Sequence, residues 1–286
     1  MSGTLFIVAT PIGNLEDITL RALRVLKEAD LIACEDTRHT RKLLSHYQIS
    51  KPTVSYHEHN EHHRTSELIA RLEAGANVAL VSDAGTPLVS DPGLRVVQEA
   101  IEHGIPVVPI PGASAFVAAV SASGLSTEQF VFAGFLPSKQ TARRARLAEL
   151  RSLPMTIVFY EAPHRIKQAL ADAREMLPGR AVVIARELTK LHEEFIRSGL
   201  SEIELPEGAR GEIVLLFGPP SSGREDEVQA NRSVAEDVEE LMRVQRLDQK
   251  TALKRVARAR GIGKSEAYRQ MLGERESDGA AEQDEG

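Results

Sequence analysis

The chain has 286 residues, of which 42% are hydrophobic, and a formal net charge of −6. This length suffices for two compact domains, and no apolar run approaches the ~20 residues that a membrane-spanning helix needs. The single cysteine, Cys34, excludes an internal disulfide and is expected to be a small buried residue; with no basic leader before the first strand, we expect a cytoplasmic protein.

Apolar, β-branched runs alternate with amphipathic helical patterns over residues 1–118. This alternation predicts an α/β domain whose sheet is mostly parallel and has helices on both faces. The expected strands are Thr4–Thr10, Leu31–Cys34, Val54–His57, Val78–Ser82 and Val107–Ile110, and the expected helices are Leu20–Ala29, Thr40–Tyr47, Thr65–Ala74 and Leu94–His103.

Residues 119–220 show a second series of the same kind, which predicts a second α/β domain. The later strands have no helical pattern between them, so this sheet is expected to be mixed. The expected strands are Phe130–Phe135, Thr156–Tyr160, Ala181–Arg186, Phe195–Gly199 and Glu212–Phe217, and the expected helices are Thr141–Ser152 and Arg165–Met176.

The remaining residues are predicted to form a linker, a small helical module and a tail. The breaker-rich run Gly218–Gly223 indicates a linker, placed at residues 221–230. Residues 231–273 are helical in pattern and basic, an excess that favours contact with RNA. Residues 274–286 are acidic and lack aromatic side chains, so a disordered tail is expected. The excess lies between Arg243 and Arg269, where Asp248 and Glu266 are the only acidic residues; the basic ones are Arg243, Arg246, Lys250, Lys254, Arg255, Arg258, Arg260, Lys264 and Arg269.

Three strand ends of the first domain run into loops rich in glycine and proline: Thr10–Asn14, Ser82–Gly93 and Pro111–Ala115. In open α/β sheets, ligands bind beyond the carboxyl ends of the strands, and glycine lets the backbone approach a ligand closely. One such loop would indicate only a tight turn. Three in one sheet predict a binding cleft.

Common nucleotide and metal motifs are absent. No G-x-G-x-x-G follows the first strand, and Gly261–Ser265 lacks the upstream glycine of a phosphate loop, because Arg258 stands there. The cluster His57–His63 has Glu61 where a helical zinc motif needs histidine. It is interpreted as a polar loop facing solvent or substrate, with a metal site as the less favoured alternative.

Four motifs carry a resemblance to a known family: Val8–Leu15, Cys34–Arg38, Phe159–Arg165 and Arg186–Lys190. With the loops described above, they resemble the tetrapyrrole methylase superfamily, and more specifically its ribosomal RNA small subunit methyltransferase I family, the cytidine-2′-O-methyltransferases of the bacterial decoding centre. The resemblance extends from about Thr4 to Phe217. The first loop, Pro11–Asn14, lacks the Gly-Pro-Gly-Asp of the tetrapyrrole-making relatives, which points away from a porphyrin-type substrate.

The resemblance implies a tetrapyrrole-methylase-like fold in which S-adenosylmethionine lies in a cleft between the two α/β domains. It also implies 16S rRNA as substrate, expected within the 30S subunit with free rRNA as the alternative, and a homodimer. No association with membranes is expected. The cofactor pocket is then expected to include Pro11, Gly13, Asp83, Gly85, Thr86, Pro87, Gly112, Ser114, Ala115 and Tyr160.

Methyl transfer from a sulfonium is an in-line displacement, so positioning and one proton acceptor should suffice without a metal. The acceptor is expected among Glu35, Asp36 and Glu161, although Glu35 and Asp36 would equally suit the start of a helix. The family motifs favour Lys190 as a catalytic residue that holds the target nucleotide. The side chains expected to bind substrate are Arg38, His57, His164, Arg165 and Arg186; ion-pair roles are the alternative for the arginines.

Two other classes of function stay open at this point. A small-molecule methylase of the same fold, of the precorrin or diphthamide type, would not need the basic C-terminal module. An RNA-binding protein without catalysis would have no reason to bind S-adenosylmethionine.

Overall fold

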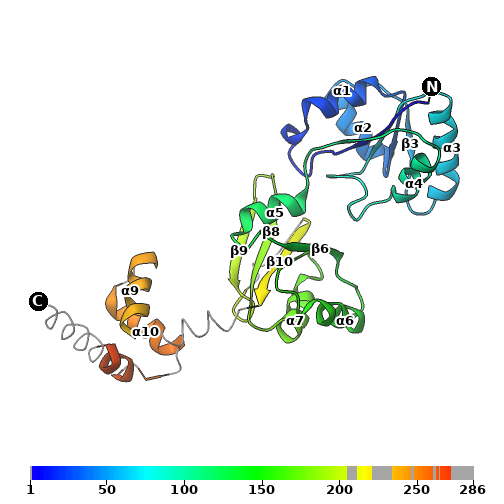
Figure 1. The fold of residues 1–286 in the computed structure, drawn as a ribbon. Helices are drawn as coiled ribbons and strands as arrows, with labels where there is room; N and C mark the ends of the chain where they lie inside the picture. The colour runs from blue at the N-terminus through cyan, green and yellow to red at the C-terminus, as the bar shows by residue number, and fades with distance from the viewer. Residues whose placement is uncertain are drawn as a thin grey trace, which may run out of the picture. The chain divides into compact units, whose positions relative to one another are not determined.

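The computed structural model describes residues 2–204, 211–220, 234–245, 248–259, 262–263 and 265–271. The chain divides into two compact units, Met1–Pro220 and Ser221–Gly286. Unit 1 holds two five-stranded sheets in its described residues, and the described part of unit 2 is helical (Figure 1).

The first sheet has the strand order β3-β2-β4-β1-β5, and every pairing in it is parallel. Helices α1 and α2 cover one face and α3 and α4 the other. Because both faces are covered, the strands are apolar along their length rather than alternating. The bounds are β1 Leu5–Val8, β2 Leu31–Cys34, β3 Thr53–Ser55, β4 Val78–Val81, β5 Val107–Ile110, α1 Leu20–Glu28, α2 Thr37–His46, α3 Glu61–Glu73 and α4 Leu94–Glu102; a short 3-10 helix, η1, spans Leu15–Asp17.

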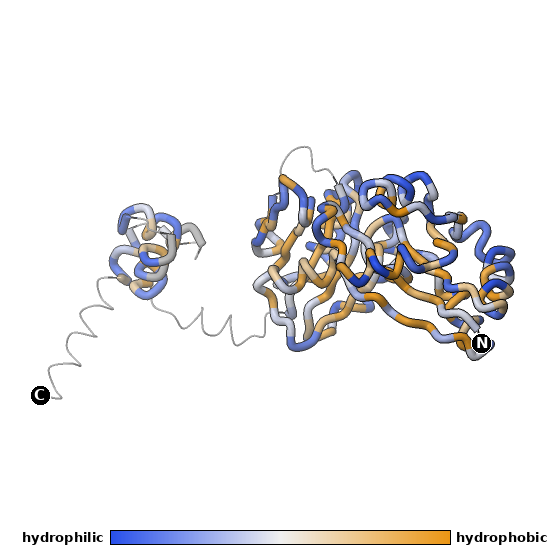
Figure 2. Tube along the Cα trace, turned by 90° about the horizontal axis from the view of Figure 1, so that it is seen from above, coloured by the Kyte–Doolittle hydropathy of each residue, from blue (hydrophilic) through white to orange (hydrophobic). Residues whose placement is uncertain are grey.

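The second sheet has the order β6-β7-β10-β8-β9, with β6 parallel to β7 and the other pairings antiparallel. Its alternate residues face two layers: α6 and α7 pack on one side and α5 on the other. Figure 2 shows the hydrophobic colour concentrated along the strands. The bounds are β6 Phe130–Phe135, β7 Thr156–Glu161, β8 Arg180–Arg186, β9 Glu194–Gly199, β10 Ile213–Pro220, α5 Ala115–Ser123, α6 Gln140–Leu150 and α7 Ile166–Met176. The predicted α/β fold class, with one parallel and one mixed sheet, is confirmed.

Helix α5 was not expected from the sequence. Its residues are small and apolar on every side, so no periodic stripe marks it as a helix. Ala119 and Val120 pack on the second sheet, whereas Val117 is 51% exposed. Gly124, at φ +80°, ends the helix in the left-handed conformation that glycine adopts without strain. The predicted boundary at residue 118 therefore falls within α5.

Three other boundaries differ from the prediction by three or more residues. Helix α2 begins at Thr37 rather than Thr40, because the Asp36 carboxylate accepts the Arg38 N–H at 2.8 Å and caps the helix. Helix α3 begins at Glu61, so His62 and His63 lie on a helix rather than in a loop. Strand β10 continues to Pro220 rather than ending at Phe217, so the first three residues of the breaker-rich run Gly218–Gly223 belong to the strand.

Arg180 explains why the chain stays ordered at the end of β10. Its buried guanidinium donates to four carbonyl oxygens, those of Gly218 (2.6 Å), Leu153 (2.7 Å), Arg151 (2.9 Å) and Met155 (3.1 Å). Burial lowers the pKa of this group. The rigid fork of the guanidinium thus joins β8, the end of β10 and the segment before β7.

The described part of unit 2 contains α9 (Val234–Gln245), α10 (Gln249–Ala259) and a helical segment at 265–271. Val238, Leu253, Val256 and Met271 form its apolar core. The predicted linker at 221–230 and acidic tail at 274–286 lie outside the described residues, as do the side chains of Arg246, Arg258, Arg260 and Lys264. Among the helices that the structure describes, none has the length and apolar character needed to cross a bilayer.

Candidate functional site

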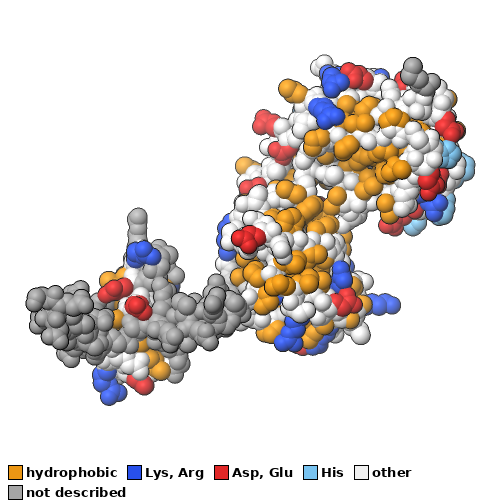
Figure 3. Space-filling view, viewed as in Figure 1, with side chains coloured by type: hydrophobic (Ala, Val, Ile, Leu, Met, Phe, Trp, Pro, Cys, Tyr) orange, Lys and Arg blue, Asp and Glu red, His pale blue; other side chains and the backbone are white. Residues whose placement is uncertain are grey.

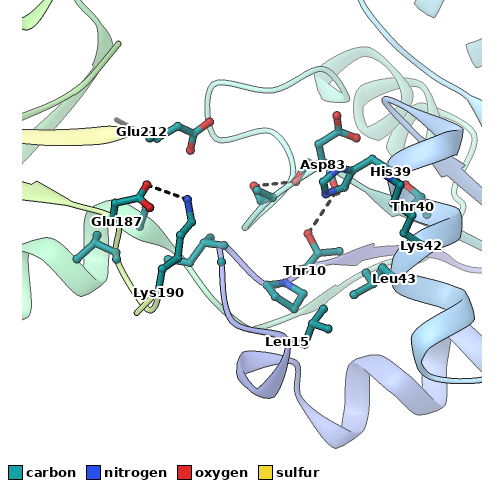
Figure 4. Close-up of a pocket in the computed structure, with 18 of the residues that line it drawn as sticks. Thr10, Leu15, His39, Thr40, Lys42, Leu43, Asp83, Glu187, Lys190 and Glu212 are labelled. Atoms are coloured by element: carbon teal, nitrogen blue, oxygen red, sulfur yellow. Dashed lines mark hydrogen bonds and ion pairs between the residues drawn. The ribbon is translucent and has the colours of Figure 1, made fainter. Parts of the chain in front are cut away.

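A cavity of about 630 Å³ lies beyond the carboxyl ends of the first sheet and is lined by residues of both sheets in unit 1. This volume is typical of sites for small molecules and cofactors. Figure 4 shows Glu187, Lys190 and Glu212 on one side, helix α2 on the opposite side and Thr10 between them.

The loops of the first sheet are fastened to one another at the cavity. The Thr10 N–H donates to the Gly85 carbonyl at 2.9 Å, and the Gly85 N–H donates back at 3.1 Å. The Thr86 hydroxyl donates to the Ala113 carbonyl at 3.1 Å, which attaches the third loop. Gly85 has φ +82°, a conformation that a side chain would strain. The three loops predicted to form a binding site therefore do meet.

The second sheet contributes the opposite wall. Lys190 crosses over the backbone of Gly13, so closely that a Cβ atom at Gly13 would lie 2.6 Å from Lys190 Cγ. Its Nζ lies 3.0 Å from Glu187 Oε1. Glu187 and Thr189 both have positive φ, at 50° and 64°. Non-glycine residues are held in this region only when their surroundings enforce it, and such strain concentrates at functional sites.

Helix α2 forms the third wall, through His39, Thr40, Lys42, Leu43 and His46. Its carboxyl end is tied to the first loop, because the Tyr47 hydroxyl donates to the Leu15 carbonyl at 2.5 Å. Its amino end is tied to the β4 loop, because the Asp36 N–H donates to Asp83 Oδ1 at 3.1 Å.

A second cavity of about 60 Å³ shares Ile12, Ala84, Ala115, Tyr160 and Glu212 with the first. Asp91 lines it and is half-buried. Burial and the nearby carboxylates of Glu35, Glu212 and Asp83 raise the pKa of Asp91 to about 6, although a hydrogen bond with Ser82 acts in the opposite direction. The backbone on both sides is constrained, with positive φ at Leu88, Ser90 and Gly93.

Eight of the ten residues predicted to bind cofactor line these cavities. Pro11, Gly13, Asp83, Ala115 and Tyr160 line the larger one, and Gly85, Thr86 and Ser114, again with Ala115 and Tyr160, line the smaller one. Pro87 and Gly112 line neither. Gly112 instead allows close packing, since a Cβ there would lie 2.9 Å from Ala9 Cβ.

Of the four residues predicted to be catalytic, only Lys190 lines a cavity. Asp36 caps α2. Glu161 is 1% exposed and pairs with Arg165 at 2.7 Å. Glu35 lies near Asp83 and Asp91, and burial, with a smaller effect of Asp83, raises its pKa.

None of the five residues predicted to bind substrate lines either cavity. Three of them are arginines in ion pairs: Arg38 with Asp36 (2.8 Å), Arg165 with Glu161 (2.7 Å) and Arg186 with Glu194 (2.5 Å). His57 contacts Asn60 through Nε2 at 3.1 Å, and His164 is exposed. Within the described residues, no group of three or more His, Cys, Asp or Glu side chains is placed to hold a metal ion.

Sequence reasoning missed several lining residues: His39, Lys42 and His46 on α2, Glu187 beside Lys190, Asp91 and Glu212. Asp91 and Glu187 lie within motifs that the sequence had singled out. Glu212 directly precedes the buried strand β10. A polar residue at the end of a buried strand is the signal that could have identified it.

Comparison with known proteins shows the family to which this chain belongs. Residues 4–204 match the family model of Tetrapyrrole (Corrin/Porphyrin) Methylases. The chain is 47% identical over 274 residues to the ribosomal RNA small subunit methyltransferase I of Halalkalibacterium halodurans, covering 93% of each chain. It is 45% identical to the protein of that name from Pseudomonas aeruginosa, over 95% of this chain and 97% of the other. The chain belongs to this family. The predicted family, and with it the prediction of a methyltransferase, is confirmed.

Solved structures agree on the fold. Diphthine synthase matches with a TM-score of 0.61 at 19% identity, over 76% of this chain and 90% of that one. Uroporphyrin-III-C-methyltransferase from Thermus thermophilus matches with a TM-score of 0.55 at 22% identity, over 76% and 94%. The same enzyme in complex with S-adenosyl homocysteine gives a TM-score of 0.53 at 20% identity, over 76% and 97%.

Proposed function

We propose that this member of the family transfers the methyl group of S-adenosylmethionine to the ribose 2′-hydroxyl of a cytidine in the decoding region of 16S rRNA. The supporting observation is the 630 Å³ cavity, whose lining combines glycine-rich loops, carboxylates and a basic helix face. The relatives that are 45% and 47% identical are named for action on small-subunit ribosomal RNA.

The lining residues fit this cofactor. Asp83, Glu187 and Glu212 offset positive charge, and Ile12, Leu188 and Val214 offer apolar surface for a purine ring. Ser114 makes no side-chain capping hydrogen bond at the start of α5, which leaves the first N–H groups of that helix for a carboxylate. When bound, S-adenosylmethionine supplies an electrophilic methyl carbon on a sulfonium leaving group.

Lys190 is the catalytic residue that we favour. Its ammonium would hold the ribose, and the Glu187 carboxylate, 3.0 Å from that ammonium, would receive the proton that the 2′-hydroxyl loses on methylation. Asp36 and Glu161 support the site from outside its lining, through the cap of α2 and the pair with Arg165. No step of this scheme uses a metal ion.

Three further proposals concern the setting of the reaction. We place it in the cytoplasm, where the ribosomal substrate is found, and on the assembled 30S subunit rather than on free rRNA. We also propose that the active form is a homodimer. The support is α5, whose apolar residues face both the second sheet and solvent.

The decisive experiment supplies labelled S-adenosylmethionine with 30S subunits or free 16S rRNA, before and after exhaustive chelation, and maps the product by nuclease digestion and mass spectrometry. A 2′-O-methylcytidine formed equally well after chelation is expected. A methyl group on the base, or activity restored specifically by zinc, would overturn the scheme.

The Lys190→Ala variant tests the assigned residue. We expect kcat to fall by about a hundredfold or more, because Lys190 holds the ribose and positions the Glu187 carboxylate, and loss of assisted proton transfer costs this much, while calorimetric affinity for S-adenosylmethionine is retained. Lys190→Arg should recover part of kcat. Full turnover by Lys190→Ala would reject the role given to this residue.

A further inference from the structure

Helix α2 is basic along its whole length. Its ten residues include Arg38, His39, Arg41, Lys42 and His46 and contain no carboxylate. Of these, His39, Lys42 and His46 line the large cavity. Their spacing of three and four residues places them on one face of the helix. A single helical face thus brings one ammonium and two imidazoles to the cavity.

The basic side chains of α2 differ in whether they already have a partner. Arg38 pairs with Asp36 at 2.8 Å, and Arg41 Nε donates to the Thr53 hydroxyl at 3.2 Å. Across the cavity, Lys190 pairs with Glu187. Lys42 is exposed, and among the described residues neither a carboxylate nor a hydrogen-bond acceptor contacts its ammonium. It is therefore the lining ammonium that can bind an anion without first leaving another partner.

The charged side chains that line the cavity are mainly acidic at one end and mainly basic at the other. Glu187 and Glu212 lie on the side of the second sheet, and Lys42 lies on the side of α2 (Figure 4). Asp83 is the lining carboxylate nearest α2, and its Oδ1 already accepts the Asp36 N–H at 3.1 Å. A cationic group is favoured at the first end and an anionic group at the second.

We propose that the face formed by His39, Lys42 and His46 binds the phosphate backbone of the RNA strand that carries the target nucleotide. This inference rests on the proposed function for the nature of the substrate, and adds where the strand lies. His39 and His46 are separated by about 10 Å along the helix axis, at 1.5 Å per residue. That length exceeds the spacing between neighbouring phosphates on one strand, so the face accommodates more than one of them.

The surroundings of this face suit a nucleotide as well as a phosphate. Leu43 on α2 and Leu15 in η1 line the same wall and provide apolar surface for a sugar or base. The Tyr47–Leu15 hydrogen bond of 2.5 Å holds these two segments together. With its phosphate on α2, a nucleotide directs its ribose across the cavity toward Lys190 and Glu187.

The test compares Lys42→Ala, Lys42→Arg and the wild-type protein on 30S subunits. Steady-state methylation gives KM and kcat, and binding of S-adenosylmethionine is measured by calorimetry. For Lys42→Ala we expect KM for 30S subunits to rise about two- to fivefold with kcat and cofactor affinity unchanged, as when one solvent-exposed charge pair is removed. The slope of log affinity against log salt should fall by roughly 0.7 to 0.9, the value for one phosphate. Lys42→Arg should behave as the wild type.

Lys167→Ala is the matched control, because Lys167 is an exposed lysine on α7 that lines neither cavity. It should leave KM and the salt slope unchanged. If the wild-type protein methylates 30S subunits but Lys42→Ala keeps the wild-type KM and slope, the inference about α2 is wrong and the proposed function stands. If the wild-type protein methylates no RNA, the proposed function itself fails.

Discussion

At the scale of single residues, Asp91 is expected to make cofactor binding depend on pH. Its pKa of about 6 reflects burial and the carboxylates of Glu35, Glu212 and Asp83. A bound sulfonium favours the ionised form of Asp91, so affinity for S-adenosylmethionine should rise as pH increases through 6. Between pH 5 and 7.5, calorimetry should show a gain of about tenfold, the equivalent of one pKa unit.

The control for this prediction is Asp91→Asn, which should flatten the pH profile without abolishing binding. The folding stability of the unliganded protein should change in the opposite sense. Because the folded-state pKa of Asp91 lies above its ordinary value of 3.8, its contribution to stability is full below pH 3.8 and is lost as pH rises through 6. If S-adenosylmethionine affinity depends on pH in the same way in the wild-type and Asp91→Asn proteins, Asp91 does not face the cofactor.

The loop residues of the site could be predicted from sequence, whereas the helix face could not. Gly85, Thr86 and Ser114 follow parallel strands, and strand ends meet at one edge of a sheet. His39 and Lys42 are polar residues on an amphipathic helix, a pattern that looks the same whether that face meets solvent or a cavity. The arginines Arg165 and Arg186 belong to recognisable motifs, but only the structure shows that Glu161 and Glu194 already pair with them.

At the scale of elements, α5 supports the proposed homodimer. Val117 is 51% exposed and Phe130, on the edge strand β6, is 41% exposed. Phe116 on α5 links them, with its ring 6.4 Å from that of Phe130. Figure 3 shows hydrophobic side chains gathered on the side of unit 1 that carries this helix. Such a patch is typical of a protein–protein contact.

Val117→Asp should therefore convert the dimer to a monomer in sedimentation velocity experiments, because a charge buried in an apolar contact is unfavourable. Ile101→Asp is the matched control, since Ile101 is 62% exposed on α4, on the first sheet. A wild-type protein that sediments as a monomer at micromolar concentration would contradict the proposal, as would a dimer unaffected by Val117→Asp.

At the scale of the whole molecule, unit 1 is expected to carry out methyl transfer and unit 2 to add affinity for RNA. Unit 1 contains both cavities, and unit 2 carries the basic residues of α10 and the segment after it. A chain ending at Pro220 should bind S-adenosylmethionine as the full chain does but should bind 30S subunits more weakly. Its salt dependence should also be flatter, by about one unit of log–log slope for each phosphate that unit 2 binds in the full chain.

Filter binding over a range of salt concentrations measures both quantities, and calorimetry on the truncated chain verifies that unit 1 is folded. RNA affinity and slope equal to those of the full chain would rule out this role for unit 2. The breaker-rich run Gly218–Gly223 is the sequence feature that predicts a separate C-terminal module. It did not predict where β10 ends, since Gly218–Pro220 resembles a linker in composition and is ordered by a distant residue, Arg180.

Arg180 also has a mechanical consequence. The carbonyl of Gly218 is held at 2.6 Å by its guanidinium, at the end of β10 remote from Glu212 and Val214. Four residues of extended strand, roughly 13 Å at 3.3 Å each, separate this anchor from Val214 at the cavity wall. We therefore expect a force on the chain beyond Pro220 to act first on the Gly218–Arg180 hydrogen bond and on the pairing of β10 with β7 and β8, and only then on Val214 and Glu212. The cavity walls should then keep their geometry when unit 2 binds a large, slowly tumbling particle.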